Sequence, residues 1–221
     1  KEPLLMGTRE NICAAMVSLV DTGLNRGASG NVSVRDGDHM LITPSGIPPL
    51  DIRPDQIARM PLSSDGEWDG PMKPSVEWRF HRDILNARPE MNAVVHTHAQ
   101  WSTVLAIARR PIPAVHYMIA AFGGPNIPLA GYATFGTPEL SAHVLHAMQG
   151  RAGCLMANHG MVVGGRDLTH ALWLANELEA LAHQHYHASL LGGGHILSDL
   201  EIADTLKGFA GYGAQAKGKT G

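Results

Sequence analysis

Ala93-Val94-Val95-His96-Thr97-His98 is the stretch that decides how we interpret the rest of the chain. Residues 92–97 are apolar and rich in β-branched side chains, and a Pro precedes them, so we predict a buried strand. Side chains alternate between the faces of a strand, so His96 and His98 point the same way. Two imidazoles on one face need only a third ligand to form the open three-histidine site typical of catalytic zinc. Hydrogen-bonded core histidines are the alternative interpretation.

A third histidine lies far downstream, in Ala157-Asn158-His159-Gly160. Short apolar strands are predicted on both sides of it, at residues 153–157 and 161–163. His159 is therefore expected in a tight turn rather than inside a helix or strand, and this position favours a ring that faces a site. We take His159 as the candidate third ligand.

His183 and His187 imitate a metal pair, because they lie four residues apart on one face of a helix predicted at residues 167–190. Neither an acid nor a third ligand is near them in the sequence. We interpret them as surface or interface histidines.

Length and composition bound the class of protein. The chain has 221 residues, of which 44% are hydrophobic and 17% charged, so we predict one domain over residues 1–221, with residues from about 212 onward as a flexible tail. A net charge of −3 gives no basic surface for nucleic acid. No run approaches the ~18–20 apolar residues that span a bilayer, and no signal pattern opens the chain, so we expect a cytoplasmic protein without a membrane partner. Cys13 and Cys154 are too few for a disulfide scaffold.

Two turns of small residues are candidates for binding an anion. Residues 27–31 lead into a predicted hairpin of strands at 32–35 and 39–42, and they offer backbone N–H groups beside Ser29 and Asn31. Residues 43–46 form a similar turn. An ordinary connection between elements explains the glycines about as well, and the Walker lysine is missing.

Glu77 is a candidate catalytic acid or base. Pro74 and Ser75 open a predicted helix with Glu77 in its first turn, just before the histidine strand. A first-turn acid that only complements the helix dipole is the simpler interpretation. Further helices are predicted at residues 8–22, 99–108, 137–148 and 198–210, the last opening with a capping box of Ser198 and Glu201.

Taken together, these stretches resemble the class II aldolase family, and within it the L-fuculose-phosphate aldolases. The similarity runs from the first helix to Tyr212. It rests on Gly23-Leu24-Asn25, Gly30-Asn31-Val32-Ser33-Val34-Arg35, Leu41-Ile42-Thr43-Pro44, Glu77-Trp78-Arg79-Phe80-His81, Ala93-Val94-Val95-His96, Ile112-Pro113-Ala114, His116-Tyr117-Met118-Ile119-Ala120-Ala121 and Tyr132-Ala133-Thr134-Phe135-Gly136-Thr137.

The resemblance implies a fold, a metal and an assembly. The fold would be a single α/β domain with three layers (αβα) around a mostly antiparallel sheet. The assembly would be a homotetramer with active sites between subunits, so that Tyr117 and Tyr212 act on a neighbour's metal. The implied site has Zn²⁺ or another divalent ion on His96, His98 and His159, Glu77 as general base, Tyr117 as proton donor, Tyr212 closing the site, and a phosphate pocket of Asn31, Ser45, Gly46 and Ser75.

The implied reaction is reversible aldol cleavage of L-fuculose 1-phosphate, or a related ketose 1-phosphate, to dihydroxyacetone phosphate and L-lactaldehyde. Such cleavage leaves an enediolate whose charge a Lewis-acid cation stabilises. A Schiff-base route needs a buried lysine, whereas the five lysines lie mostly near the termini. A 4-epimerase, a dehydratase, a decarboxylase and a non-catalytic adducin-like binding domain are the alternatives.

Two positions depart from the family pattern in the phosphate pocket. Ala28 and Val76 stand where the family enzyme has Thr and a second Ser. Each loses a hydroxyl, and one hydrogen bond to a charged group contributes about 1.5–3 kcal/mol. Weaker phosphate binding, or an unphosphorylated donor of the dihydroxyacetone type, is the consequence we expect.

Overall fold

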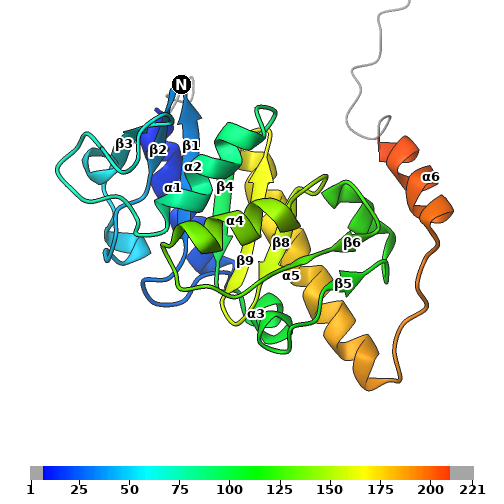
Figure 1. Cartoon of the computed structure of the whole chain (residues 1–221). Coiled ribbons are helices and arrows are strands. Elements are labelled where there is room, and N and C mark those ends of the chain that lie inside the picture. The colour runs from blue at the N-terminus through cyan, green and yellow to red at the C-terminus, as the bar shows by residue number, and fades with distance from the viewer. Residues whose placement is uncertain (1–6, 210–221) are drawn as a thin grey trace, which may run out of the picture.

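The histidine strand is β4 (Ala93–Thr97), and it lies in the middle of a seven-stranded sheet (Figure 1). The computed structural model describes residues 7–209. The strand order is β3-β2-β1-β4-β9-β8-β7, and every neighbouring pair is antiparallel except β7 and β8. The prediction of a mostly antiparallel α/β sheet is therefore confirmed.

The other strands are short, and several are joined by tight turns. In the main sheet they are β1 (Asn31–Asp36), β2 (His39–Ile42), β3 (Ala58–Pro61), β7 (Leu129–Ala130), β8 (Gly153–Met156) and β9 (Gly160–Gly165). A separate two-stranded sheet pairs β5 (Ile112–Pro113) with β6 (Asn126–Ile127). The predicted hairpin is present as β1 and β2, with Gly37 in the left-handed conformation at its turn.

Helices cover both faces of the sheet and make three layers. One face carries α1 (Thr8–Asp21), α3 (Gln100–Ile107) and α5 (Leu168–Leu190), and the other carries α2 (Trp78–Ala87) and α4 (Pro138–Ala147). The chain ends its described part in α6 (Asp199–Phe209), which packs on η3 (Tyr117–Phe122) outside these layers (Figure 1). Two further 3-10 turns are η1 (Pro49–Asp51) and η2 (Pro54–Gln56).

Alternation along β4 decides which layer the histidines face. Val95 joins the core formed with α1 and α5, whereas Val94 joins the core formed with α2 and α4. His96 lies two residues after Val94 and therefore on the same face of the strand. Its ring meets Phe80 of α2 edge-on, with 5.5 Å between the ring centroids. His96 on β4 is therefore presented on the α2 side of the sheet.

Several predicted helix bounds differ from the observed ones by one residue, whereas α2 begins at Trp78 rather than at Pro74 or Ser75. The prediction that Glu77 lies in the first helical turn was wrong, because α2 begins at Trp78 and Glu77 occupies the N-cap position. The capping box before α6 is confirmed: Ser198 N–H donates to Glu201 Oε2 at 2.7 Å, and Glu201 N–H donates to Ser198 Oγ at 3.3 Å. The predicted tail from residue 212 lies outside the described residues. Among the described helices, none is long and apolar enough to cross a membrane.

Candidate metal centre and active site

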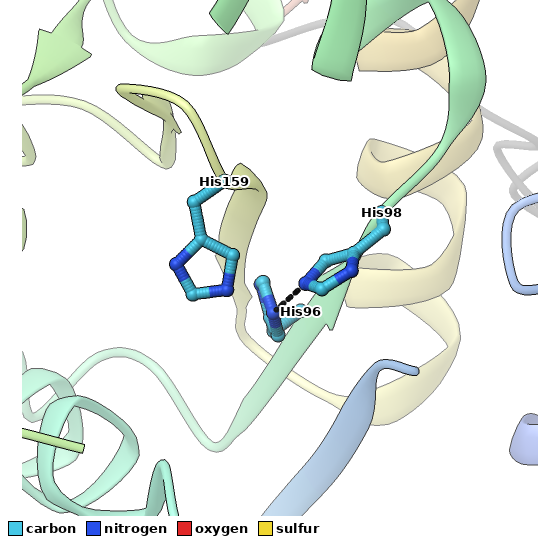
Figure 2. Close-up of side chains that lie close together, drawn as sticks. All are labelled: His96, His98 and His159. Atoms are coloured by element: carbon cyan, nitrogen blue, oxygen red, sulfur yellow. Dashed lines mark hydrogen bonds between the residues drawn. The ribbon is translucent and has the colours of Figure 1, made fainter. Parts of the chain in front are cut away.

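His96, His98 and His159 converge at one end of the sheet (Figure 2). Their candidate ligand atoms all lie within 4.8 Å of one another, and the Nε2 atoms of His96 and His98 are 3.1 Å apart. Each pair of rings meets at 4.9 Å between centroids and close to perpendicular. Within residues 7–209 this is the only group of three or more His, Cys, Asp or Glu residues placed to hold a metal ion.

The backbone of β9 orients the most buried ligand. His96 Nδ1 donates to the carbonyl oxygen of Met161 at 2.8 Å, which leaves Nε2 without its proton and directed at the other two rings. Burial, with His96 and His159 nearby, lowers the pKa of His98 to about 4. His98 is therefore neutral at physiological pH, as an imidazole ligand must be. The donor set fits a divalent transition metal such as zinc.

A strained turn carries His159 to the other two histidines. Asn158, just before it, has a φ of 55°, which places a non-glycine residue in the left-handed region. Asn158 N–H donates to the carbonyl oxygen of Ala106 at 3.1 Å, and Arg109 Nε donates to Asn158 Oδ1 at 3.0 Å. The end of α3 thus holds the turn that projects His159.

Glu77 lies against the same histidines. Its Oε2 is 3.3 Å from His96 Nε2, and its Oε1 is 3.1 Å from His159 Nε2. Burial alone raises the pKa of this carboxyl group, but His96 and His159 outweigh burial and hold it well below its usual value. Glu77 is therefore ionised, which is the state a general base requires. In turn, burial lowers the pKa of His96, but Glu77 outweighs burial and raises it.

The segments predicted to bind phosphate are brought side by side. Ser45 N–H donates to the carbonyl oxygen of Lys73 at 3.0 Å, and Ser75 N–H donates to that of Thr43 at 2.9 Å. Gly46 follows with a φ of 72°. Asn31, at the start of β1, donates through Nδ2 to Glu77 Oε2 at 2.9 Å, and one amide hydrogen stays available.

Tyr117 is not brought to the histidines within one chain. It is 52% exposed on η3, and its ring lies beside His116 and Phe209, with centroids at 4.7 and 6.4 Å. Tyr212 lies outside the described residues. His183 stacks on Trp101 at 4.4 Å, with His187 at 5.3 Å, so that pair packs on an aromatic ring away from the triad.

Sequence reasoning missed the apolar side of the site. A pocket of about 330 Å³ opens beside Glu77, His98 and His159, and its other lining residues are Val76, Tyr132, Ala133, Phe135 and Asn158. Tyr132 and Phe135 are more than half exposed, at 56% and 61%. Both belong to a stretch quoted for the family resemblance, but exposure of a large apolar ring is visible only once the fold is known.

The fold has a close counterpart among solved structures. An L-fuculose 1-phosphate aldolase superposes with a TM-score of 0.88 at 35% identity, over 93% of this chain and 98% of that chain. The model of the class II aldolase and adducin N-terminal domain matches residues 10–186.

Relatives at higher identity carry two kinds of name. The 5-methylthioribulose-1-phosphate/5-deoxyribulose-1-phosphate aldolase of Rhodospirillum rubrum is 51% identical over 95% of this chain and 94% of its own. The L-fuculose phosphate aldolase of Escherichia coli K12 is 46% identical over 91% of this chain and 92% of its own. Fold, site and relatives together define a carbon–carbon lyase. The chain belongs to the class II aldolase family, whose members depend on a metal ion.

Proposed function

We propose that this aldolase cleaves a ketose 1-phosphate between C3 and C4, giving dihydroxyacetone phosphate and an aldehyde that ends in an apolar group. The observation that carries the proposal is the two-sided pocket. Its polar side holds Glu77, His98 and His159, and its apolar side holds Val76, Tyr132 and Phe135. A substrate with a polar reacting end and an apolar terminus matches both sides.

The substrates named for the relatives share this design. Cleavage between C3 and C4 of 5-deoxyribulose 1-phosphate gives acetaldehyde, and that of the 5-methylthio sugar gives (methylthio)acetaldehyde. L-Fuculose 1-phosphate, a 6-deoxy sugar, gives L-lactaldehyde. All three release the same phosphorylated fragment, so they differ only in the portion that would lie against the apolar residues.

The chain's own residues supply orientation and proton transfer. His96, His98 and His159 would hold a zinc ion, which supplies a Lewis acid for the substrate oxygens. In the direction of synthesis, Glu77 takes the C3 proton of dihydroxyacetone phosphate, and Tyr117 gives a proton to the aldehyde oxygen. Cleavage reverses both transfers. Asn31, Ser45, Gly46 and Ser75 bind the phosphate, with the hydroxyls missing at Ala28 and Val76 lowering its affinity.

A panel of ketoses tests the substrate. Zinc-loaded enzyme is assayed for dihydroxyacetone phosphate released from the 1-phosphates of L-fuculose, 5-deoxyribulose and 5-methylthioribulose, and for cleavage of the unphosphorylated sugars. We expect kcat/KM at least tenfold higher for the phosphorylated sugars, and almost none in Glu77→Gln. Equal rates with unphosphorylated sugars would show that the pocket for the donor phosphate has changed. Full turnover by Glu77→Gln would show that Glu77 is not the general base.

We propose further that the enzyme is a homotetramer whose sites lie between subunits. The position of Tyr117 supports this, since the residue is exposed and does not line the pocket beside its own triad. Co-expressed Glu77→Gln and Tyr117→Phe subunits, each inactive alone, should then form hybrid sites that combine an intact Glu77 with an intact Tyr117. Recovery of a substantial fraction of activity is expected, whereas a mixture as inactive as its parts would place Glu77 and Tyr117 of one site in the same subunit.

A further inference from the structure

A chain of buried hydrogen bonds runs behind Glu77, away from the pocket. Ser33 Oγ lies 2.8 Å from His81 Nδ1, His81 Nε2 lies 2.5 Å from Asn31 Oδ1, and Asn31 Nδ2 lies 2.9 Å from Glu77 Oε2. Ser33 and His81 are fully buried, and Asn31 and Glu77 are 5% and 7% exposed. Four polar side chains are therefore linked in a region where each unmade hydrogen bond is costly.

Only one direction of donation satisfies this chain. Asn31 Nδ2 faces Glu77 Oε2 and can only donate, which leaves Asn31 Oδ1 to accept from His81. His81 must then carry its proton on Nε2, and its bare Nδ1 accepts from the Ser33 hydroxyl. Burial of His81, reinforced by His96, lowers its pKa to about 3, although Glu77 opposes the shift. A neutral ring lets the Ser33 hydroxyl donate to Nδ1, whereas a protonated ring would donate from Nδ1 to Ser33 Oγ and leave the hydroxyl hydrogen without an acceptor in this chain.

The chain makes the two oxygens of Glu77 unequal. Oε2 is held by Asn31. Oε1 lies 3.1 Å from His159 Nε2, but no group in the described part of the protein makes a hydrogen bond of acceptable geometry with it. One oxygen is thus anchored and the other is free to accept a proton.

We propose that Ser33 and His81 are positioning residues that lock the Asn31 amide, so that Glu77 is anchored through Oε2 and presents Oε1 to the substrate proton. This inference rests on the proposed role of Glu77 as base. His81 touches neither substrate nor metal in it and acts through Asn31 alone. Its loss therefore lowers the rate of proton transfer while leaving metal binding in place.

Exchange of the C3 proton of dihydroxyacetone phosphate in D₂O, followed by NMR, tests the inference without any aldehyde. In zinc-loaded His81→Phe, which keeps a flat ring beside Phe80, we expect exchange to fall roughly 10- to 100-fold, the equivalent of one hydrogen bond to a charged group. His81→Gln, whose amide can replace the Nε2 donor, should recover most of that rate. Zinc content should stay unchanged in both.

The double variant separates a role through Glu77 from a general structural role. His81→Phe should add no further loss of exchange to Glu77→Gln, whereas independent losses would multiply. Full exchange by His81→Phe, lost zinc, or a ¹⁵N spectrum with the His81 proton on Nδ1 would overturn the inference. Full exchange by Glu77→Gln would instead overturn the proposed function of Glu77, so the two failures are distinguishable.

Discussion

His81 is a buried histidine that the protein keeps uncharged, and this has a consequence for stability as well as for the site. Its pKa is lowered to about 3, chiefly because burial disfavours the charged ring. An unfolded chain leaves the same ring in water, with a pKa of about 6.5. Between these two values the unfolded chain binds a proton that the folded protein does not, so acid favours unfolding.

The free energy of unfolding should therefore depend on pH through His81. The contribution of His81 to the unfolding free energy is fully present above about pH 6.5 and is lost as the pH falls toward 3. Between pH 8 and pH 5 the metal-free protein should lose about 2 kcal/mol on account of this residue. Urea unfolding at both pH values, for the unaltered protein and for His81→Phe, isolates the effect. The same pH dependence in both proteins would contradict it.

At the scale of single residues, the sequence singled out the three histidines that converge in the fold and Glu77, which lies beside them, but not the residues behind them. His96 and His98 stand out because their spacing puts both on one face of a strand. His81 stands four residues after Glu77, which puts the two near one another along a helix. That spacing was a usable signal, but the partners Ser33 and Asn31 come from a different strand, and only the fold brings them together.

Among the elements, the pairing of β4 with β9 does most to place the ligands. The register sets His96 opposite Val162 and Thr97 opposite Met161, so the turn before β9 returns His159 to the end of β4. Gly160 lies where the two strands meet. A Cβ atom there would press on the carbonyl oxygen of Thr97 and would lie 2.9 Å from His98 Cδ2.

Gly160→Ala is therefore expected to displace the end of β4. Backbone atoms cannot yield as a flexible side chain does, and overpacking of this kind costs about 1–3 kcal/mol. We expect a lower melting temperature together with weaker zinc binding, measured by competition with a chromogenic chelator. Gly208→Ala in α6, where the added Cβ meets nothing within 4 Å, is the matched control. Unchanged zinc affinity in Gly160→Ala would show that the strand end adapts.

Helices and strands whose apolar residues recur at a regular spacing were predicted well, and strands of two residues were not. The strands β1 and β2 show alternating apolar and polar residues, and the helices show a helical spacing of apolar residues or capping residues at their ends. These elements appear within a few residues of the predicted bounds. β5, β6 and β7 have two residues each, too few to show a pattern. β7 also pairs with β8, which lies more than twenty residues later in the chain, so the sequence near β7 does not indicate its partner.

On the scale of the whole molecule, the site joins parts of the chain that are distant in sequence. The candidate ligands come from the end of β4 and from the turn before β9, and Glu77 comes from the start of α2 in the layer that covers that face. An ion bound there links the two central strands of the sheet. Any ligand that binds only the folded state stabilises it in proportion to the logarithm of its free concentration.

Removal of the metal should therefore lower thermal stability. With the ion at 100 times its dissociation constant, the linkage amounts to about 2.7 kcal/mol, or roughly 5–10 °C for a protein of this size. Differential scanning calorimetry with and without a chelator measures the shift, and added zinc should reverse it. His98→Ala, which removes the most exposed ligand, should melt at the same temperature in both conditions. A shift of equal size in that variant would place the stabilising ion elsewhere.

At the N-terminus of α2, the stability of the helix and the activity of the enzyme place different demands on the same residue. Glu77 occupies the N-cap position but makes no capping hydrogen bond, because its carboxylate faces the histidines. A Ser in its place would cap the helix, which contributes about 0.5–2 kcal/mol, but would lose the contacts that Glu77 makes with Asn31 and the histidines. Selection for a capped helix alone would discard the base, so variants at this position have to be selected on turnover at the same time.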